Sequence, residues 1–389
     1  MRLETYRHPD ELIDQRAPYD IAHAQEIAGK CDYESIHAEL TEKQILEKHT
    51  KTVQEEYSQH FSEKNFVLEQ KDWEMLAILD LYDTPTLEHS IRTFDIAHDM
   101  MTKTLSGPND EAIRLEVFIR SEGVSLRQFL RAALFHDIGK VTIPREILNN
   151  DFTDPEMDRI ILRMFHNGAC KDICTTLGLL HGETVSDETI LKTIFAEGYR
   201  SVDLVPIEEA FPQERYPKLL EIIDQNGYSR KQTLKSILEL HEEASASILG
   251  DDAIVAELAG HHHNYKGEDS KHKISIAALQ ISTEIDEYAM MHLISIADKT
   301  DALRSDRVYK KSFNEFEIFV ELIREASIGR LNKALVYLWI SNQYPNVKAS
   351  AHNNLPALPP KETDSECMEF IETFLAESKR QIETNVKIQ

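Results

Sequence analysis

The chain has 389 residues, with 68 acidic and 43 basic side chains and a formal net charge of −25 at pH 7. A chain of this length can bury a sizeable core without disulfides. So strong a negative charge makes general nucleic-acid binding unfavourable. Four cysteines without a disulfide framework are typical of a reducing compartment, so we expect a cytoplasmic protein. The sequence has neither a run of about 20 apolar residues nor an apolar N-terminal segment, and it predicts no membrane span and no signal peptide.

Helix is the dominant predicted element along the chain. Glycine and proline are sparse, at 13 residues each, and strand-like alternation is rare, so the sequence predicts an all-α protein. Residues 1–72 are expected to form a helical N-terminal region. A main domain is expected over 73–342, with a helix that begins at Thr86 as its N-cap. Residues 343–389 are expected to form a linker, as far as Pro360, and a C-terminal helix.

The dipeptide His136-Asp137 is the most informative feature of the chain, because it directly follows the apolar run Ala132–Phe135. The apolar pattern predicts that both ionisable side chains are buried, and buried ionisable groups need partners. A divalent metal satisfies both at once, because imidazole nitrogen and carboxylate oxygen are common metal ligands. One dipeptide cannot hold an ion alone, so further ligands must come from other segments.

Candidate ligands lie on or beside other segments with helical spacing. His261 and His262 continue the apolar stripe of Ile254, at seven and eight residues. Asp298 lies four residues after Ile294, so its carboxylate points the same way as its apolar neighbour. Ligands that project inward from several helices are typical of metal sites in helical bundles. The candidate metal ligands are His89, His136, Asp137, His241, His261, His262 and Asp298.

The order of these residues, together with two longer segments, resembles a known family. The segments His136–Leu148 (HDIGKVTIPREIL) and Ala297–Lys311 (ADKTDALRSDRVYKK) are similar to the HD superfamily of metal-dependent phosphohydrolases, specifically to its HD-GYP branch of cyclic-dinucleotide phosphodiesterases. The similarity covers residues 85–340, with an interruption. It implies an HD-domain helical bundle and a small nucleotide substrate, a cyclic dinucleotide such as cyclic di-GMP.

The loop after which the branch is named differs in this chain. In the branch, His-His-Glu is followed by two residues, Asp-Gly and then Gly-Tyr-Pro, whereas this chain reads HHHNYKG from His261 to Gly267. A gapless alignment makes His261 and His262 the metal ligands, with His263 in place of the Glu and Lys266 in place of the Asp. A shifted alignment, kept as the alternative, uses His262 and His263. The Gly-Tyr-Pro tripeptide is missing, which bears on the substrate more than on the metal chemistry.

A helical insertion is expected over residues 150–227, and it separates two candidates for the family's third histidine. His166 has the expected distance from His136. His241 has the more similar surroundings, because an Ala-Ser-Ala-Ser-Ile-Leu run and then the triple histidine follow it closely. The sequence favours His241, and His166 stays as the alternative.

The number of candidate ligands indicates two metal ions. Seven ligands exceed what one ion needs if it keeps open positions for water and substrate. We therefore expect two divalent ions bridged by Asp137, at a separation of ~3.5–4 Å. A hydroxide that bridges the ions would attack the phosphorus, so no serine or cysteine nucleophile is needed. Mixed histidine and carboxylate ligation favours Fe or Mn, with Zn, Ni and Mg as alternatives.

Three basic side chains are expected to hold the substrate. Lys140 follows the His-Asp dipeptide, and Arg307 and Lys310 lie in the second matched segment. The resemblance implies this role, because residues at the matching positions contact substrate phosphates in the family. Guanidinium and ammonium groups both bind phosphate well. The predicted catalytic residues are Asp137 and Lys140.

Two other functions are compatible with the sequence. The first is an HD phosphohydrolase that acts on another nucleotide or on a phosphate monoester, which the missing Gly-Tyr-Pro favours. The second is a catalytically inactive module that binds a nucleotide or a partner protein, with the acidic segment 363–380 as a docking surface. An idle buried site with so many charged groups would be costly, which argues against the inactive module. The sequence leaves the oligomeric state open, with a dimer as one alternative.

Overall fold

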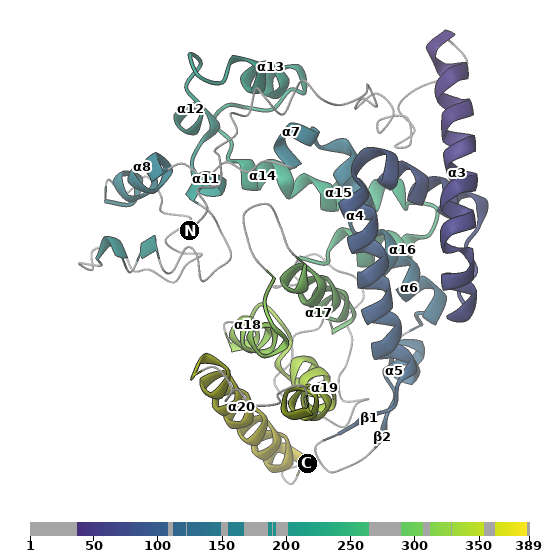
Figure 1. The fold of residues 1–389 in the computed structure, drawn as a ribbon, viewed down its shortest axis with the longest axis vertical. Coiled ribbons are helices and arrows are strands. Elements are labelled where there is room, and N and C mark those ends of the chain that lie inside the picture. The colour runs from purple at the N-terminus through teal and green to yellow at the C-terminus, as the bar shows by residue number, and fades with distance from the viewer. Residues whose placement is uncertain are drawn as a thin grey trace. The chain divides into compact units, whose positions relative to one another are not determined.

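The computed structural model describes residues 37–107, 112–121, 123–148, 155–166, 186–188, 190–191, 201–263, 289–305, 312–327, 329–353 and 362–386. These residues are mostly helical (Figure 1), which confirms the predicted all-α class. Within these ranges the only strands are the short antiparallel pair β1 (Leu105–Ser106) and β2 (Ala112–Ile113). None of the helices described combines the length and the apolarity that a membrane crossing requires.

The chain divides into two compact units, which we describe separately. The larger unit consists of Glu26–Gly139 and Glu242–Gln389, and the smaller of Met1–Gln25 and Lys140–His241. The helices of the larger unit are α3 (His37–Glu63), α4 (Gln70–Thr102), α5 (Leu115–Ser121), α6 (Leu126–Phe135), α15 (Leu240–Ile248, within this unit from Glu242), α16 (Ala253–Gly260), α17 (Ala289–Arg304), α18 (Glu315–Ser327), α19 (Lys333–Asn353) and α20 (Glu362–Val386). A 3-10 helix, Ile138–Thr142, spans the boundary between the units.

The smaller unit has its own hydrophobic core. Its helices are α7 (Arg145–Leu148), α8 (Pro155–His166), α11 (Ser201–Leu204), α12 (Ile207–Ala210), α13 (Pro217–Gln225) and α14 (Leu234–Leu238). Buried apolar side chains from Ile143 to Ile237 form one cluster, which includes Phe211 and Tyr216. The range of this unit encloses the insertion expected over 150–227.

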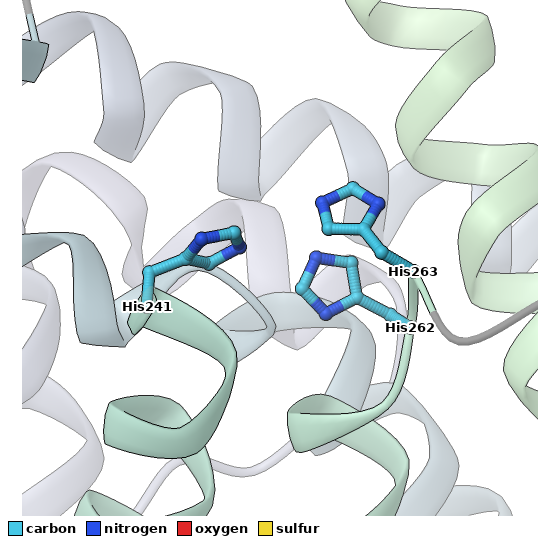
Figure 2. A group of neighbouring side chains, drawn as sticks. All are labelled: His241, His262 and His263. Atoms are coloured by element: carbon cyan, nitrogen blue, oxygen red, sulfur yellow. The ribbon is translucent and has the colours of Figure 1, made fainter. Parts of the chain in front are cut away.

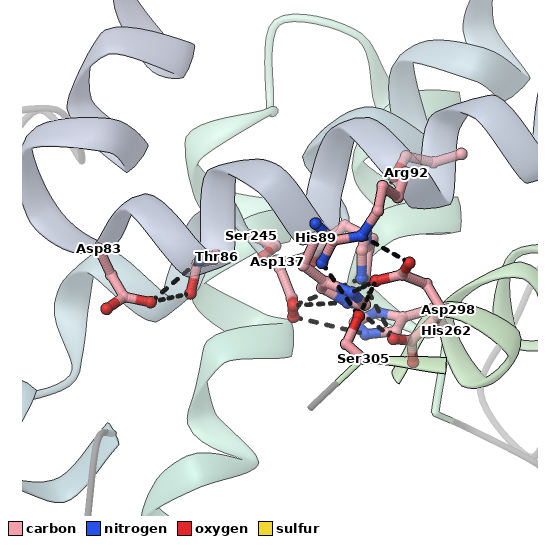
Figure 3. A network of polar contacts seen from close by, with 12 residues as sticks. Asp83, Thr86, His89, Arg92, Asp137, Ser245, His262, Asp298 and Ser305 are labelled. Carbon is pink, nitrogen blue, oxygen red and sulfur yellow. Dashed lines mark hydrogen bonds and ion pairs between the residues drawn. The ribbon is translucent and has the colours of Figure 1, made fainter. Parts of the chain in front are cut away.

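Helix α4 is the central element of the larger unit, because it packs against α3, α6 and α17. A kink divides it at Asp83, whose φ of −158° and ψ of 94° are not helical. The carboxylate of Asp83 accepts hydrogen bonds from the backbone N–H of Thr86 at 3.0 Å and from its hydroxyl at 2.6 Å (Figure 3). Pro85 lacks an N–H and its ring clashes with a continuous helix, so the chain restarts the helix here. Asp83 therefore caps the second half of α4, and the prediction that Thr86 is the N-cap is wrong.

Helix α3 packs along α4 within the larger unit. Phe61 lies against Trp73 and Phe94, with ring centroids 5.8 Å and 5.1 Å away. His49 and His60 contact Asp80 and Asp95 on α4, with N–O distances of 2.7 and 2.9 Å. The boundary expected at residue 72 falls in the first turn of α4, which begins at Gln70.

The C-terminal part of the larger unit is a packed group of three helices. α18 contacts both α19 and α20, and α19 contacts α20. α19 continues through Pro345 to Asn353, so the first part of the expected linker is helical. α20 buries Ile371 and Phe374, whereas Phe370 is exposed.

We predict that Phe61→Ala destabilises the larger unit by about 3–5 kcal/mol, because the substitution leaves a cavity in the aromatic cluster between α3 and α4. Urea unfolding followed by circular dichroism measures the effect. Glu55→Ala, at an exposed position of α3, is the control and should change stability by less than about 0.5 kcal/mol. Equal unfolding midpoints for the two variants would contradict this packing.

Candidate metal centre

The first group of potential ligands comes from three helices of the larger unit. α4 carries His89, His136 directly follows α6, and α17 carries Asp298. All three side chains are buried. Nε2 of His89 lies 2.9 Å from Oδ1 of Asp298, and Nε2 of His136 lies 3.7 Å from the same oxygen. These residues form one of the sets whose ligand atoms lie within 4.8 Å of one another.

Asp137 connects this first group to a second set. Its Oδ2 lies 3.4 Å from Nε2 of His136 and 3.5 Å from Nε2 of His89. Its other oxygen, Oδ1, lies 4.0 Å from Nε2 of His262. His136, Asp137 and His262 therefore form a second set of potential ligands, and all three are buried.

A third set consists of His241, His262 and His263, whose rings lie side by side in Figure 2. His241 is the second residue of α15, a helix that continues in the larger unit from Glu242. His262 and His263 directly follow α16. The backbone N–H of His263 donates to Oε1 of Glu242 at 2.8 Å, which ties this turn to α15.

Three of these histidines, His136, His241 and His262, lie one to three residues after the last residue of a helix, and each uses a carbonyl of that helix. Nδ1 of His136 lies 2.9 Å from the carbonyl oxygen of Ala133. Nδ1 of His241 lies 2.5 Å from that of Leu238, and Nδ1 of His262 lies 2.6 Å from that of Ala259. The last carbonyls of a helix lack intrahelical partners, so they are available as acceptors. A carbonyl oxygen can only accept, so Nδ1 carries the hydrogen and Nε2 presents its lone pair to the centre.

Two buried serines hold the ligand segments together. Oγ of Ser245 on α15 donates to the carbonyl oxygen of His136 at 2.7 Å and accepts the N–H of Gly139 at 2.8 Å. Oγ of Ser295 on α17 contacts the carbonyl oxygens of His262 and, at 3.0 Å, Met291. The His-Asp turn is thereby fixed to α15, and the turn after α16 is fixed to α17.

Gly260 lets α16 end close to α15. A Cβ at this position would lie 2.6 Å from Cβ of Ala246 and 3.2 Å from the carbonyl oxygen of Glu242. No side chain fits in that space without movement of backbone. The close approach brings His262, at the end of α16, near His241, at the start of α15.

The electrostatics of the centre favour a bound cation. Burial alone would raise the pKa of Asp298, but the imidazoles of His136 and His89 hold it well below its ordinary value. Nε2 of His136 is buried and has no hydrogen-bond partner among the residues described, and it faces the carboxylates of Asp137 and Asp298. A lone pair that faces carboxylates is repelled unless a proton or a metal cation lies between them. Imidazole nitrogens and carboxylate oxygens are the ligands that Fe, Mn and Zn accept, so the residues fit a divalent metal.

Six of the seven candidate ligands belong to these sets: His89, His136, Asp137, His241, His262 and Asp298. His261 is half-buried and lies outside them, and His263 is present instead, which favours the alternative pair His262 and His263. His166 on α8 also lies outside them, and its Nε2 is 2.7 Å from Asp187.

Of the three predicted substrate-binding residues, one lies within the residues described. Lys140 lies half-buried in the 3-10 helix after Asp137. Arg307 and Lys310 fall outside the residues described, as does Lys266 of the variant loop.

Sequence reasoning missed the residues that hold the ligand segments together, which are Ser245, Gly260 and Ser295. A weak signal existed for two of them, because Ser245 lies four residues after His241 and Ser295 three residues before Asp298. Asp301 lies one helical turn after Asp298, so the sequence places it on the same face of the helix as a candidate ligand. Its Oδ2 lies 2.7 Å from Nδ1 of His89, where it can orient that ring.

Comparison with family models gives one match: residues 86–202 match the model of the HD domain. This part of the chain is therefore similar to an HD domain. The matched range includes His89, His136 and Asp137, and it ends before His241. HD domains bind divalent metals and are generally metal-dependent hydrolases, so the match and the ligand sets together support a metal-dependent phosphohydrolase. The match supports the HD superfamily and not the HD-GYP branch in particular. Neither the curated proteins nor the solved structures gave a match.

We predict that Ser245→Ala destabilises the larger unit by about 1–3 kcal/mol, because it leaves a buried carbonyl and a buried N–H without their partner. Urea unfolding of the chelator-treated protein measures this effect without a contribution from metal. Ser247→Ala, at an exposed position on the same helix, is the control and should leave stability nearly unchanged. If both variants unfold like the unsubstituted protein, Ser245 does not fix the His-Asp turn.

We predict that Gly260→Ala weakens metal binding at the set of His241, His262 and His263, because the new methyl group forces α15 and α16 apart. The overpacking should also destabilise the protein by about 1–3 kcal/mol. Calorimetric titration with Mn²⁺ measures the binding. The double variant Ala246→Gly with Gly260→Ala removes the closest clash and should recover most of the affinity. Wild-type affinity in the single variant would show that the close approach is not required.

Proposed function

We propose that the chain is a dinuclear-metal phosphodiesterase that hydrolyses a cyclic dinucleotide of the cyclic di-GMP kind. The orientation of Asp137 is the observation that carries this proposal. Its Oδ2 is directed at His89 and His136, at 3.5 and 3.4 Å, while its Oδ1 is directed at His262, at 4.0 Å. A carboxylate whose two oxygens face two ligand sets can bridge two cations, as two-metal hydrolases require.

The ligand sets suggest how the ions are divided. The first ion would be held by His89, His136, Asp137 and Asp298, and the second by Asp137, His241, His262 and His263. The donor types fit Fe or Mn, with Zn, Ni and Mg as alternatives. Two such ions would supply Lewis acidity and an activated water for attack on a phosphodiester.

The chain's own residues would place the ions and the substrate. Asp137 would hold both ions, because its carboxylate is buried and faces histidines on both sides. Lys140, three residues further along the chain, and Arg307 and Lys310 would hold the phosphate oxygens. Arg binds phosphate through two parallel N–H bonds, and Lys binds it as a point charge.

The substrate class rests on the two segments that resemble the HD-GYP branch, His136–Leu148 and Ala297–Lys311. A second candidate function is hydrolysis of another nucleotide or of a phosphate monoester. Two observations favour it: the Gly-Tyr-Pro tripeptide is missing after the triple histidine, and the family match extends to the HD domain in general.

Hydrolysis of a panel of nucleotides separates the two candidates. The protein, purified without oxygen and supplied with Fe²⁺ or Mn²⁺, is incubated with cyclic di-GMP, a linear dinucleotide and a nucleoside monophosphate. Cleavage of the cyclic dinucleotide supports the first candidate, and turnover of the monophosphate alone supports the second. Binding without any turnover would contradict both and indicate an inactive binding module.

We predict that Asp137→Asn lowers both metal content and hydrolysis. The amide keeps the shape of the side chain but removes the charge that would bridge the ions. We expect activity to fall by more than about 100-fold, because even residues that only orient metal ligands cost 10–100-fold when they are replaced. Elemental analysis of anaerobically purified protein measures the metal. His166→Ala, at an exposed histidine outside the ligand sets, should retain both metal and activity. Unchanged metal in Asp137→Asn would refute the assignment of the site.

A further inference from the structure

Behind His89 lies a polar network that connects α4 to the end of α17. Nδ1 of His89 lies 2.7 Å from Oδ2 of Asp301, and Nε of Arg92 donates to Oδ1 of the same carboxylate at 2.7 Å. A second guanidinium nitrogen, Nη2 of Arg92, donates to Oγ of Ser305 at 3.1 Å, and this hydroxyl lies 3.3 Å from Oδ2 of Asp301. Nη1 of Arg92 lies 3.5 Å from Oε2 of Glu88. Figure 3 shows Arg92, His89 and Ser305 in this arrangement.

His89 differs from the other ligand histidines in what can hold its ring. His136, His241 and His262 follow helix ends and use backbone carbonyls three residues earlier in the chain. His89 lies inside the second half of α4, where backbone carbonyls are engaged in helical hydrogen bonds. Its Nδ1–H therefore needs an acceptor from outside the helix, and Asp301 of α17 supplies it.

We propose that Arg92 is a positioning residue of the metal centre, which fixes the carboxylate of Asp301 so that Asp301 fixes the imidazole of His89. This inference rests on the proposed function, because it assumes that His89 binds one of the two ions. The guanidinium is planar and contacts both the carboxylate and Ser305, so it sets the plane of the carboxylate as well as its position. The carboxylate, fully buried, in turn sets the direction in which Nε2 of His89 points.

The contacts of Arg92 distinguish this role from a general role in folding. Its side chain is 41% exposed, but the carboxylate of Asp301 is buried, so a loss of stability alone would not identify a positioning role. Its contacts lead to His89 and thus to the first ligand set, and to none of His241, His262 and His263. The loss of Arg92 should therefore affect one ion and spare the other.

Calorimetric titration of the metal-free full-length protein with Mn²⁺ tests this asymmetry. Two reference variants, His89→Ala and His241→Ala, identify the binding steps of the first and the second ion. We expect Arg92→Gln to weaken the step that His89→Ala removes by about 10–100-fold and to leave the other step within about 2-fold. Arg92→Lys keeps the charge but cannot make the paired contact, so it should recover part of the affinity. Arg324→Gln, at an exposed arginine of α18, should bind both ions like the wild type.

A double-mutant cycle tests whether Arg92 acts through Asp301. In an Asp301→Asn background, Arg92→Gln should cause little further loss of affinity, because the carboxylate that it orients is already gone. Three outcomes would overturn the proposal. The two substitutions could have independent effects, Arg92→Gln could weaken both binding steps equally, or Arg92→Gln could bind metal like the wild type. Thermal unfolding of the metal-free variants checks folding, and if neither Arg92→Gln nor Arg92→Lys folds, Arg92 is a structural residue and the proposal is wrong. If the wild type binds two ions but hydrolyses no nucleotide, the proposed function fails while this test of Arg92 still stands.

Discussion

The centre of the larger unit depends on one electrostatic constraint: buried hydrogen-bond acceptors face one another. Imidazole Nε2 atoms, with their lone pairs, lie 2.9–4.0 Å from the carboxylate oxygens of Asp137 and Asp298. These side chains are buried, so water has little access to them. Such contacts are repulsive without positive charge among them, and burial makes the repulsion stronger. A proton relieves one contact, for example between His89 and Asp298. A divalent cation relieves several at once, which is why the same residues fit a metal centre better than a chain of ordinary hydrogen bonds.

The fold satisfies this constraint largely with helix ends. Three ligand histidines follow the last residues of α6, α14 and α16, where unused carbonyls fix the tautomer and the ring direction. Where a ligand lies within a helix, as His89 does, a carboxylate from another helix takes the place of the carbonyl. Ser245, Ser295 and Gly260 then bring the helix ends into contact. The geometry of the centre is thus set by how the helices begin, end and approach one another.

These features explain what could be predicted from the sequence. The helical class, the His136-Asp137 dipeptide and the direction of Asp298 follow from composition and from spacing within a continuous helix. The stripe that selected His261 extends beyond Gly260, where α16 ends and the backbone of His261 leaves the helical region, with φ of −132° and ψ of 19°. Helical periodicity cannot select between neighbouring histidines there. The kink at Asp83 depends on a side-chain cap, and the contact between Arg92 and Asp301 joins residues 209 positions apart, so neither leaves a periodic signal.

The charge of the chain gives the metal a second role in the proposed reaction. A protein with a net charge of −25 and three buried carboxylates in its centre, at Asp137, Asp298 and Asp301, repels a phosphate ester. Arg92 balances only part of this charge, because it is directed at Asp301 and Ser305. Two divalent cations would reverse the sign of the local potential, since bound cations are the largest charges in such sites. Substrate affinity should therefore depend on the metal as strongly as the chemical step does. Loss of either ion would prevent the substrate from binding, so hydrolysis would fail already at the binding step.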